Sequence, residues 1–328
     1  MIFYITVLRA LAAILITNAH YTGVYPIEII ANGGLLGDVI FFCVSGFCLY
    51  NIKQKFPQWY SKRIIRIYPT VWIITGLYLI LGFYSLKTMN IFEYFIYPTY
   101  YHFIASIILL YIIYYIIIKN DKLKNNIGKI MIGLAFIHII VYVLFYDKGY
   151  YHIDTVREPM IRFLFLQSML LGAYFRKNYD RYEKNTKIID WIKLVVFFII
   201  YFASKLAFSR IDSISNYQII NQIILFILLY YFMKCFAGIN KKLEKMPNKI
   251  KKIIKFISEI TLEIYLVQYV IIPIFANMIF PINWIIITTI IIISAYILHK
   301  VSGYIINLIN TKILKIEEKN ESISNRVN

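Results

Sequence analysis

Acidic residues and cysteines are both scarce in this sequence. Only 17 of its 328 residues are Asp or Glu, against 35 Lys or Arg, and three are Cys. The cysteines (Cys43, Cys48 and Cys235) lack metal-ligand spacing, so we interpret them as small apolar residues and predict no metal site. A nucleotide-binding loop is also missing, which argues against an energised pump. The absence of paired Gly/Pro-broken helices removes the usual sign of a transporter core.

Apolar residues, in contrast, make up 60% of the chain, and the mean hydropathy is +0.66. A soluble domain of this size cannot bury so much Ile, Phe and Tyr, so we predict an all-α, multi-pass membrane protein. With about 20 residues per span, the apolar runs give ten transmembrane helices. They are Ile2–Tyr21, Gly34–Ile52, Ile67–Leu86, His102–Ile118, Ile130–Tyr146, Met160–Phe175, Ile188–Leu206, Tyr217–Phe236, Ser258–Phe280 and Ile282–Ile305.

The basic residues alternate between the connections. Those after the second, fourth, sixth and eighth spans carry four or more Lys or Arg each, and the others carry two or fewer. By the positive-inside rule, both termini are cytoplasmic. Because the net charge of +18 sits in short loops between apolar runs, it indicates orientation and contact with anionic membrane lipids rather than nucleic-acid binding.

The domain organisation is expected to be simple. Residues 1–311 form one transmembrane domain, and residues 312–328 form a cytoplasmic, disordered tail. The first apolar run is preceded by no basic stretch and followed by no small-residue cleavage site, so we expect it to be retained as a helix.

Two basic side chains, Arg9 and His20, interrupt the first predicted span. An Arg at the centre of such a helix costs roughly 2.5–3.5 kcal/mol on insertion scales, so it must face protein or water. Eleven residues are close to three turns, which places both groups on one face, roughly 16 Å apart. His20 is a candidate general base. The alternative is an interfacial His20 beside Tyr21, with Arg9 in a structural ion pair.

A second candidate lies in the next span, where Asp38 and Ser45 are seven residues apart and share a face. Gly37 and Gly46 would let another helix approach closely, so that Asp38 pairs with Arg9. The alternative is a packing face of small residues with one structural salt bridge.

Arg63 and Arg66 form a third candidate, one turn apart on a predicted amphipathic, cytoplasmic connection before Pro69. Guanidinium groups suit phosphates, including those of a coenzyme or a lipid headgroup. The alternative is a positive-inside anchor, which explains the charge but not the choice of Arg where the loops otherwise prefer Lys.

Two smaller groups of ionisable residues complete the candidates. Glu259 and Glu263 share a face near the inner end of the ninth span, where they pair with other groups or balance the arginines. The other histidines have no ligand spacing and are expected to be interfacial or packed. They are His102, His138, His152 and His299.

These blocks, taken together and in this order, resemble the acyltransferase-3 family of integral membrane acyltransferases. The resemblance rests on Arg9 with His20, on Phe41-Phe42-x-x-Ser45-Gly46-Phe47, and on Arg63-x-x-Arg66-x-x-Pro69. Weaker similarity continues through Arg162-Phe163 to Gly172 and around Tyr265-Leu266, so it covers nearly the whole chain.

The resemblance implies transfer of an acyl group, usually acetyl from cytoplasmic acetyl-CoA, to a hydroxyl of a cell-surface or lipid-linked glycan. His20 would be the base or a transient acyl carrier, and Arg9 would stabilise charge or fix His20. Asp38 and Ser45 would orient these groups, and Arg63 and Arg66 would hold acetyl-CoA. Since His20 lies outward and the two arginines inward, a cavity must connect the two sides.

The expected partners are a glycan or lipid-linked sugar acceptor and membrane lipids, and the expected location is a bacterial-type plasma membrane. The rival hypothesis is a non-enzymatic transporter or flippase of envelope glycans or lipids, which would use the same buried charges to pass a phosphorylated substrate. Release of free CoA from acetyl-CoA distinguishes the two.

Overall fold

The computed structural model describes residues 2–155 and 159–327, and every regular element in these ranges is helical. Helices satisfy their own backbone hydrogen bonds, which is what a segment in lipid requires. The chain divides into two compact units. The first comprises residues 1–22, 29–53 and 102–261, and the second comprises residues 23–28, 54–101 and 262–328.

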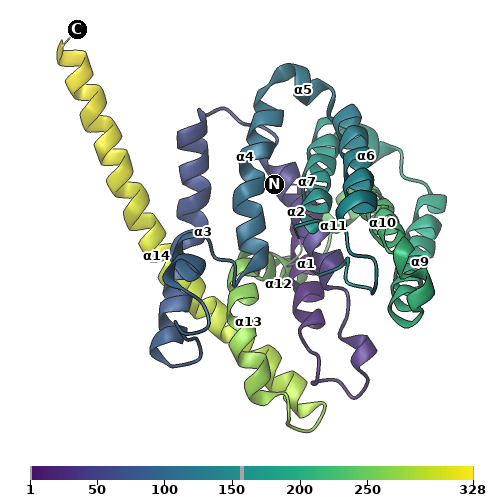
Figure 1. Cartoon of the computed structure of the whole chain (residues 1–328). Helices are drawn as coiled ribbons and strands as arrows, with labels where there is room; N and C mark the ends of the chain where they lie inside the picture. Colours follow the sequence, from purple (N-terminus) through teal and green to yellow (C-terminus); the bar gives the residue numbers. More distant parts are fainter. Residues whose placement is uncertain (1, 156–158, 328) are drawn as a thin grey trace. The chain divides into compact units, whose positions relative to one another are not determined.

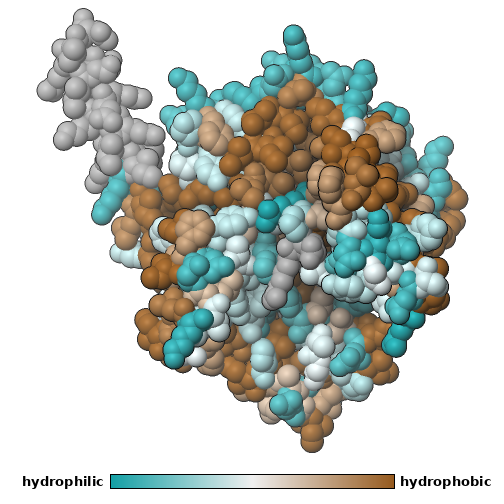
Figure 2. Space-filling model, in the orientation of Figure 1, coloured by the Kyte–Doolittle hydropathy of each residue, from teal (hydrophilic) through white to brown (hydrophobic). Residues whose placement is uncertain are grey.

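The first unit is a bundle of long helices joined by short ones. Its helices are α1 Phe3–Ala19, α2 Gly34–Leu49, α4 His102–Lys119, α5 Asp121–Asn125, α6 Ile127–Phe145, α7 Ile161–Lys177, α8 Tyr179–Lys184, α9 Ile188–Arg210, α10 Ile219–Gly238, α11 Asn240–Glu244 and α12 Asn248–Glu259. The short helix α5 joins α4 to α6 (Figure 1). Hydrophilic residues gather over α5, and hydrophobic residues cover the faces of α4 and α6 beneath it (Figure 2).

The helices α2 and α7 are in direct backbone contact. A Cβ atom added to Gly46 would collide with the Met169 carbonyl oxygen, and one added to Gly172 would collide with the Cys43 carbonyl oxygen. Only glycine permits this approach, because any larger residue at either position needs the space that the facing backbone fills. Gly46 of the Ser45-Gly46-Phe47 block is therefore a packing residue.

The helix α1 lies antiparallel along α2. A Cβ atom at Gly34 would lie 2.9 Å from the Ala19 Cβ, whereas the ring centroids of Tyr4 and Phe47 are 5.8 Å apart. The first turn of α1 is fixed by Asn240 of α11, whose Oδ1 accepts a hydrogen bond from the Tyr4 backbone N–H at 3.0 Å. This side chain satisfies one of the donors that a helix start leaves open.

The second unit contains α3 Phe56–Ile80, α13 Thr261–Phe275 and α14 Ile282–Val327. The prediction of a span at Ile67–Leu86 was wrong in its bounds. The helix begins at Phe56 and ends at Ile80, where Gly82 adopts a left-handed conformation with φ +77°. The Phe83 N–H bonds to the Tyr78 carbonyl at 2.9 Å, the hydrogen bond that closes such a glycine-terminated helix.

Each of the ten predicted spans corresponds to a helix, but fewer satisfy a strict test of length and composition. Among the described residues, seven helices are long and apolar enough to cross a membrane, or up to eight if the bent pair of α12 and α13 counts as one span. The helices α1 and α7 have 17 residues each, which gives about 26 Å against a hydrocarbon core of about 30 Å. The count of ten, the orientation of the termini and the domain boundary after residue 311 stay predictions.

Candidate active site

Arg9 projects from the middle of α1 toward the end of α2. Its Nη2 donates a hydrogen bond to the Sγ of Cys48 at 3.6 Å. The expected pairing of Arg9 with Asp38 is wrong, because no ion pair joins them in the part of the chain that the structure describes. The antiparallel packing of α1 on α2 explains the difference: Arg9 lies level with Cys48, and Asp38 is ten residues away along α2.

His20 caps the carboxyl end of α1. Its backbone N–H bonds to the Thr17 carbonyl at 3.0 Å. The turn beyond it is fixed by the Asn18 side chain, whose Nδ2 donates to the Ile30 carbonyl at 2.8 Å and to the Asn32 carbonyl at 2.9 Å. The imidazole is therefore attached to a backbone that hydrogen bonds hold on both sides.

Asp38 is buried in the second turn of α2, with 5% of its surface exposed. It lies one residue after Gly37, whose added Cβ would meet Ile16 and Ala12 of α1. Asp38 also acts electrostatically on Tyr201 of α9. The Tyr201 hydroxyl is buried and has no hydrogen-bond partner among the described residues. Ser45, the other predicted α2 residue, is half-buried two turns further along.

A polar cluster that sequence reasoning missed lies at the His20 end of α1. Lys205 of α9 forms an ion pair with Asp154, Nζ to Oδ2 2.6 Å, and donates to Asn32 Oδ1 at 3.0 Å. Burial and the neighbouring Asp154 carboxylate raise the pKa of Tyr151 above its ordinary value. A lysine inside an apolar span was the available signal, since ionisable residues in membrane spans mark functional sites.

The second unit carries the two predicted coenzyme-binding arginines. Both lie within α3 rather than on a separate connection, because the helix already begins at Phe56. The Arg63 guanidinium lies 5.6 Å from the Trp59 ring centroid. Arg66 is exposed and acts electrostatically on Glu263 of α13.

Glu263 itself is buried and pairs with a residue 36 positions further on. Its Oε1 lies 2.9 Å from Nδ1 of His299 in α14. Its other oxygen, Oε2, is buried without a partner among the described residues. The expectation that Glu263 pairs with other groups is confirmed, and its partner His299 is more than a packed histidine. In residues 2–155 and 159–327, no group of three or more His, Cys, Asp or Glu is arranged to hold a metal ion.

A comparison with protein families gives one match, to a family model described as an acyltransferase domain, over residues 2–299. The matched range covers most of both units and includes every predicted site residue. Neither the curated proteins nor the solved structures gave a match.

Proposed function

Since this chain belongs to the acyltransferase-3 family and is a membrane acyltransferase, we propose that it moves an acetyl group from acetyl-CoA to a hydroxyl of a cell-surface or lipid-linked glycan. We place it in a bacterial-type plasma membrane, in keeping with its multiple apolar helices. The observation that carries the proposal is the family match over residues 2–299, together with the ionisable side chains of α1 and α2.

His20 is the base of this proposal. Acyl transfer to a hydroxyl requires removal of the hydroxyl proton as the oxygen attacks the acyl carbon, and a neutral imidazole accepts that proton near neutral pH. The cluster of Lys205, Asp154 and Asn32 lies at the same end of α1 as His20. Its amide and charged groups suit the hydroxyl and acidic groups of a sugar, so we assign the acceptor to this end.

Arg9 contacts a different part of the substrates than His20 does. Eleven residues of helix separate it from His20, about 16 Å along the axis, so the two side chains do not both reach one reacting carbon. The half-buried Arg9 guanidinium attracts negative charge more strongly than it would in bulk water, because the dielectric beside the protein is lower. We therefore assign Arg9 to an anionic part of a substrate rather than to the hydroxyl. Asp38 and Ser45 orient groups along α2, between these two points.

Arg63 and Arg66 fit a coenzyme that carries phosphates. They lie one turn apart on α3, and Arg66 is exposed. Guanidinium groups bind phosphate oxygens in pairs of parallel hydrogen bonds. When bound, acetyl-CoA supplies the activated acyl thioester, and in this proposal the arginines hold its phosphates.

The test is acetyl transfer by membranes that contain the protein. His20→Ala should abolish release of free CoA in the presence of a glycan acceptor while the amount of protein in the membrane stays unchanged. His152→Ala, a histidine on the loop before α7, is the matched control and should retain activity. An active His20→Ala protein would remove the assigned base. Movement of a lipid-linked glycan without any CoA release would favour a flippase instead.

A further inference from the structure

A groove separate from these sites lies in the first unit, between α6, α7 and α10. Its volume is about 210 Å³. Apolar side chains from α6 and α10 form most of its wall, among them Met131, Ala135 and Phe226. The residues of α6 that line it run from Gly128 to Ile139, a length of about 16 Å along the helix. The groove is therefore long and narrow, in the shape of a hydrocarbon chain.

The groove also has polar side chains in its wall. His138 of α6, Gln167 of α7 and Gln222 of α10 line it, and each is at most 5% exposed. Three of their atoms have no hydrogen-bond partner among the described residues: His138 Nε2, Gln167 Nε2 and Gln222 Oε1. A buried polar group without a partner costs about 1–3 kcal/mol. Three such atoms on residues that line one groove indicate a ligand that pairs with them.

The chemistry of the three atoms restricts that ligand. Gln167 Nε2 is a donor and requires an acceptor, whereas Gln222 Oε1 is an acceptor and requires a donor. His138 Nε2 serves in either role, depending on its tautomer. A hydroxyl group offers both functions. Since the residues that line the groove include no Asp, Glu, Lys or Arg, a charged headgroup would stay unpaired there.

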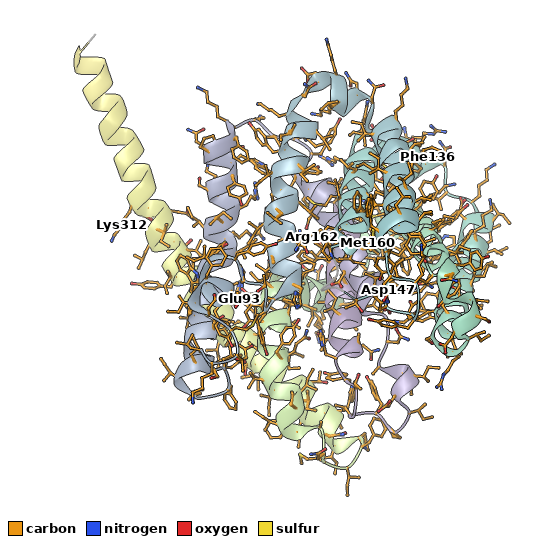
Figure 3. The ribbon with its side chains drawn as sticks, in the orientation of Figure 1. Glu93, Phe136, Asp147, Met160, Arg162 and Lys312 are labelled. Atoms are coloured by element: carbon orange, nitrogen blue, oxygen red, sulfur yellow. The ribbon has the colours of Figure 1, made fainter. Side chains whose placement is uncertain are left out.

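The groove opens to the outer surface of the helices. Ile132 of α6 is 61% exposed, and Ile223 of α10 is 42% exposed. Both belong to helices that are long and apolar enough to cross a membrane. Phe136 of α6, labelled in Figure 3, is 64% exposed. These exposed apolar side chains face lipid in a membrane, so a ligand enters from the bilayer.

We infer that this groove binds a neutral membrane lipid that carries a free hydroxyl, such as a diacylglycerol. Its hydroxyl lies against His138, Gln167 and Gln222, and its acyl chain runs along α6 toward Gly128. The site is independent of acyl transfer, because none of its residues belongs to the assigned machinery.

The experiment uses the whole protein in phosphatidylcholine nanodiscs with a trace of photoreactive lipid. One probe is a diacylglycerol with a diazirine in one acyl chain, and the second is the same molecule with its hydroxyl converted to a methyl ether. After illumination, labelled peptides are identified by mass spectrometry. We expect label on α6, α7 and α10, with about tenfold more from the hydroxyl probe, as expected for one to two hydrogen bonds.

Two variants and a control locate the site. Ala135→Phe fills the middle of the groove and should remove labelling by both probes. Gly133→Phe adds the same ring two residues away and outside the groove, at a position where a Cβ meets nothing within 4 Å. This variant should be labelled to the same extent as the wild type. Gln167→Leu should reduce the labelling yield of the hydroxyl probe to that of the ether probe.

A higher labelling yield from the hydroxyl probe, lost in Ala135→Phe, supports the inference. Equal yields from the two probes in the wild type, or full labelling of Ala135→Phe, would overturn the inference and leave the three polar atoms to water alone. If Ala135→Phe does not fold, Gln167→Leu decides by itself, since it replaces a buried unpaired amide with an apolar group of similar shape.

Discussion

The Arg9 guanidinium donates to the Cys48 thiol sulfur at 3.6 Å, so a cysteine of α2 positions the charged side chain of α1. We predict that Cys48→Ala lowers kcat/KM for acetyl transfer about fivefold, since a hydrogen bond contributes about 1 kcal/mol. The measurement is acetyl transfer by membranes at matched protein amounts.

Cys48→Ser keeps an acceptor at this position and should remain close to the wild type. Cys235→Ala, a change at a cysteine of α10, should leave the rate unchanged. Equal rates for Cys48→Ala and the wild type would mean that Arg9 is positioned by other groups.

The pair of Glu263 and His299 connects α13 to α14. We predict that His299→Phe destabilises the protein by about 2 kcal/mol, because it leaves a buried carboxylate without its partner. Thermal unfolding in detergent measures the effect.

The double variant His299→Phe with Glu263→Leu should recover most of this stability, since both polar partners are then gone. If the two changes are additive instead, the 2.9 Å contact does not couple them.

Arg66 is exposed on α3, where a phosphate can reach it. We predict that Arg66→Ala raises the KM for acetyl-CoA about tenfold with a smaller change in kcat, because a charge-assisted hydrogen bond contributes about 1.5–3 kcal/mol. Arg66→Lys should restore only part of the affinity for acetyl-CoA, since an ammonium group lacks the planar pair of donors. Lys62→Ala, a change at an exposed neighbour, is the control. A large fall in kcat at unchanged KM would contradict a role in donor binding.

Gly46 faces the Met169 backbone of α7. Gly46→Ala should lower stability by about 1–3 kcal/mol, the usual cost of overpacking. Gly133→Ala, where a Cβ meets nothing within 4 Å, should instead raise stability by about 0.5–1 kcal/mol through helix propensity. Thermal unfolding of both variants measures these opposite effects. Equal melting temperatures of the two variants would refute the prediction.

The helices were predictable from hydropathy because an apolar run of span length is helical in lipid. The fourth span was expected at His102–Ile118, and α4 is His102–Lys119. Hydropathy failed where a helix continues into basic residues: α3 begins at Phe56, eleven residues before the expected start, because the segment that contains Arg63 and Arg66 is helical although it is polar.

The pairings of the candidate site residues could not be predicted from the sequence. Arg9 and Asp38 carry opposite charges, which suggested an ion pair, yet the register of two packed helices decides which side chains meet. That register depends on contacts such as Ala19 with Gly34, which composition does not reveal. The Glu263–His299 pair joins residues on two helices in the same way. Lys205 gave a usable signal as a charge within an apolar run, but its partner Asp154 lies in a loop that has no such signature.

The glycine contacts between α2 and α7 have a consequence for how substrates travel. Two helices whose backbones touch leave no room between them, and neither rotates without breaking that seam. The helix α1 approaches α2 just as closely, since a Cβ atom added to Gly37 would lie 2.8 Å from the Ala12 carbonyl oxygen. A conformational change that makes room for substrates therefore cannot come from α1 or α7 sliding over α2 at these glycines.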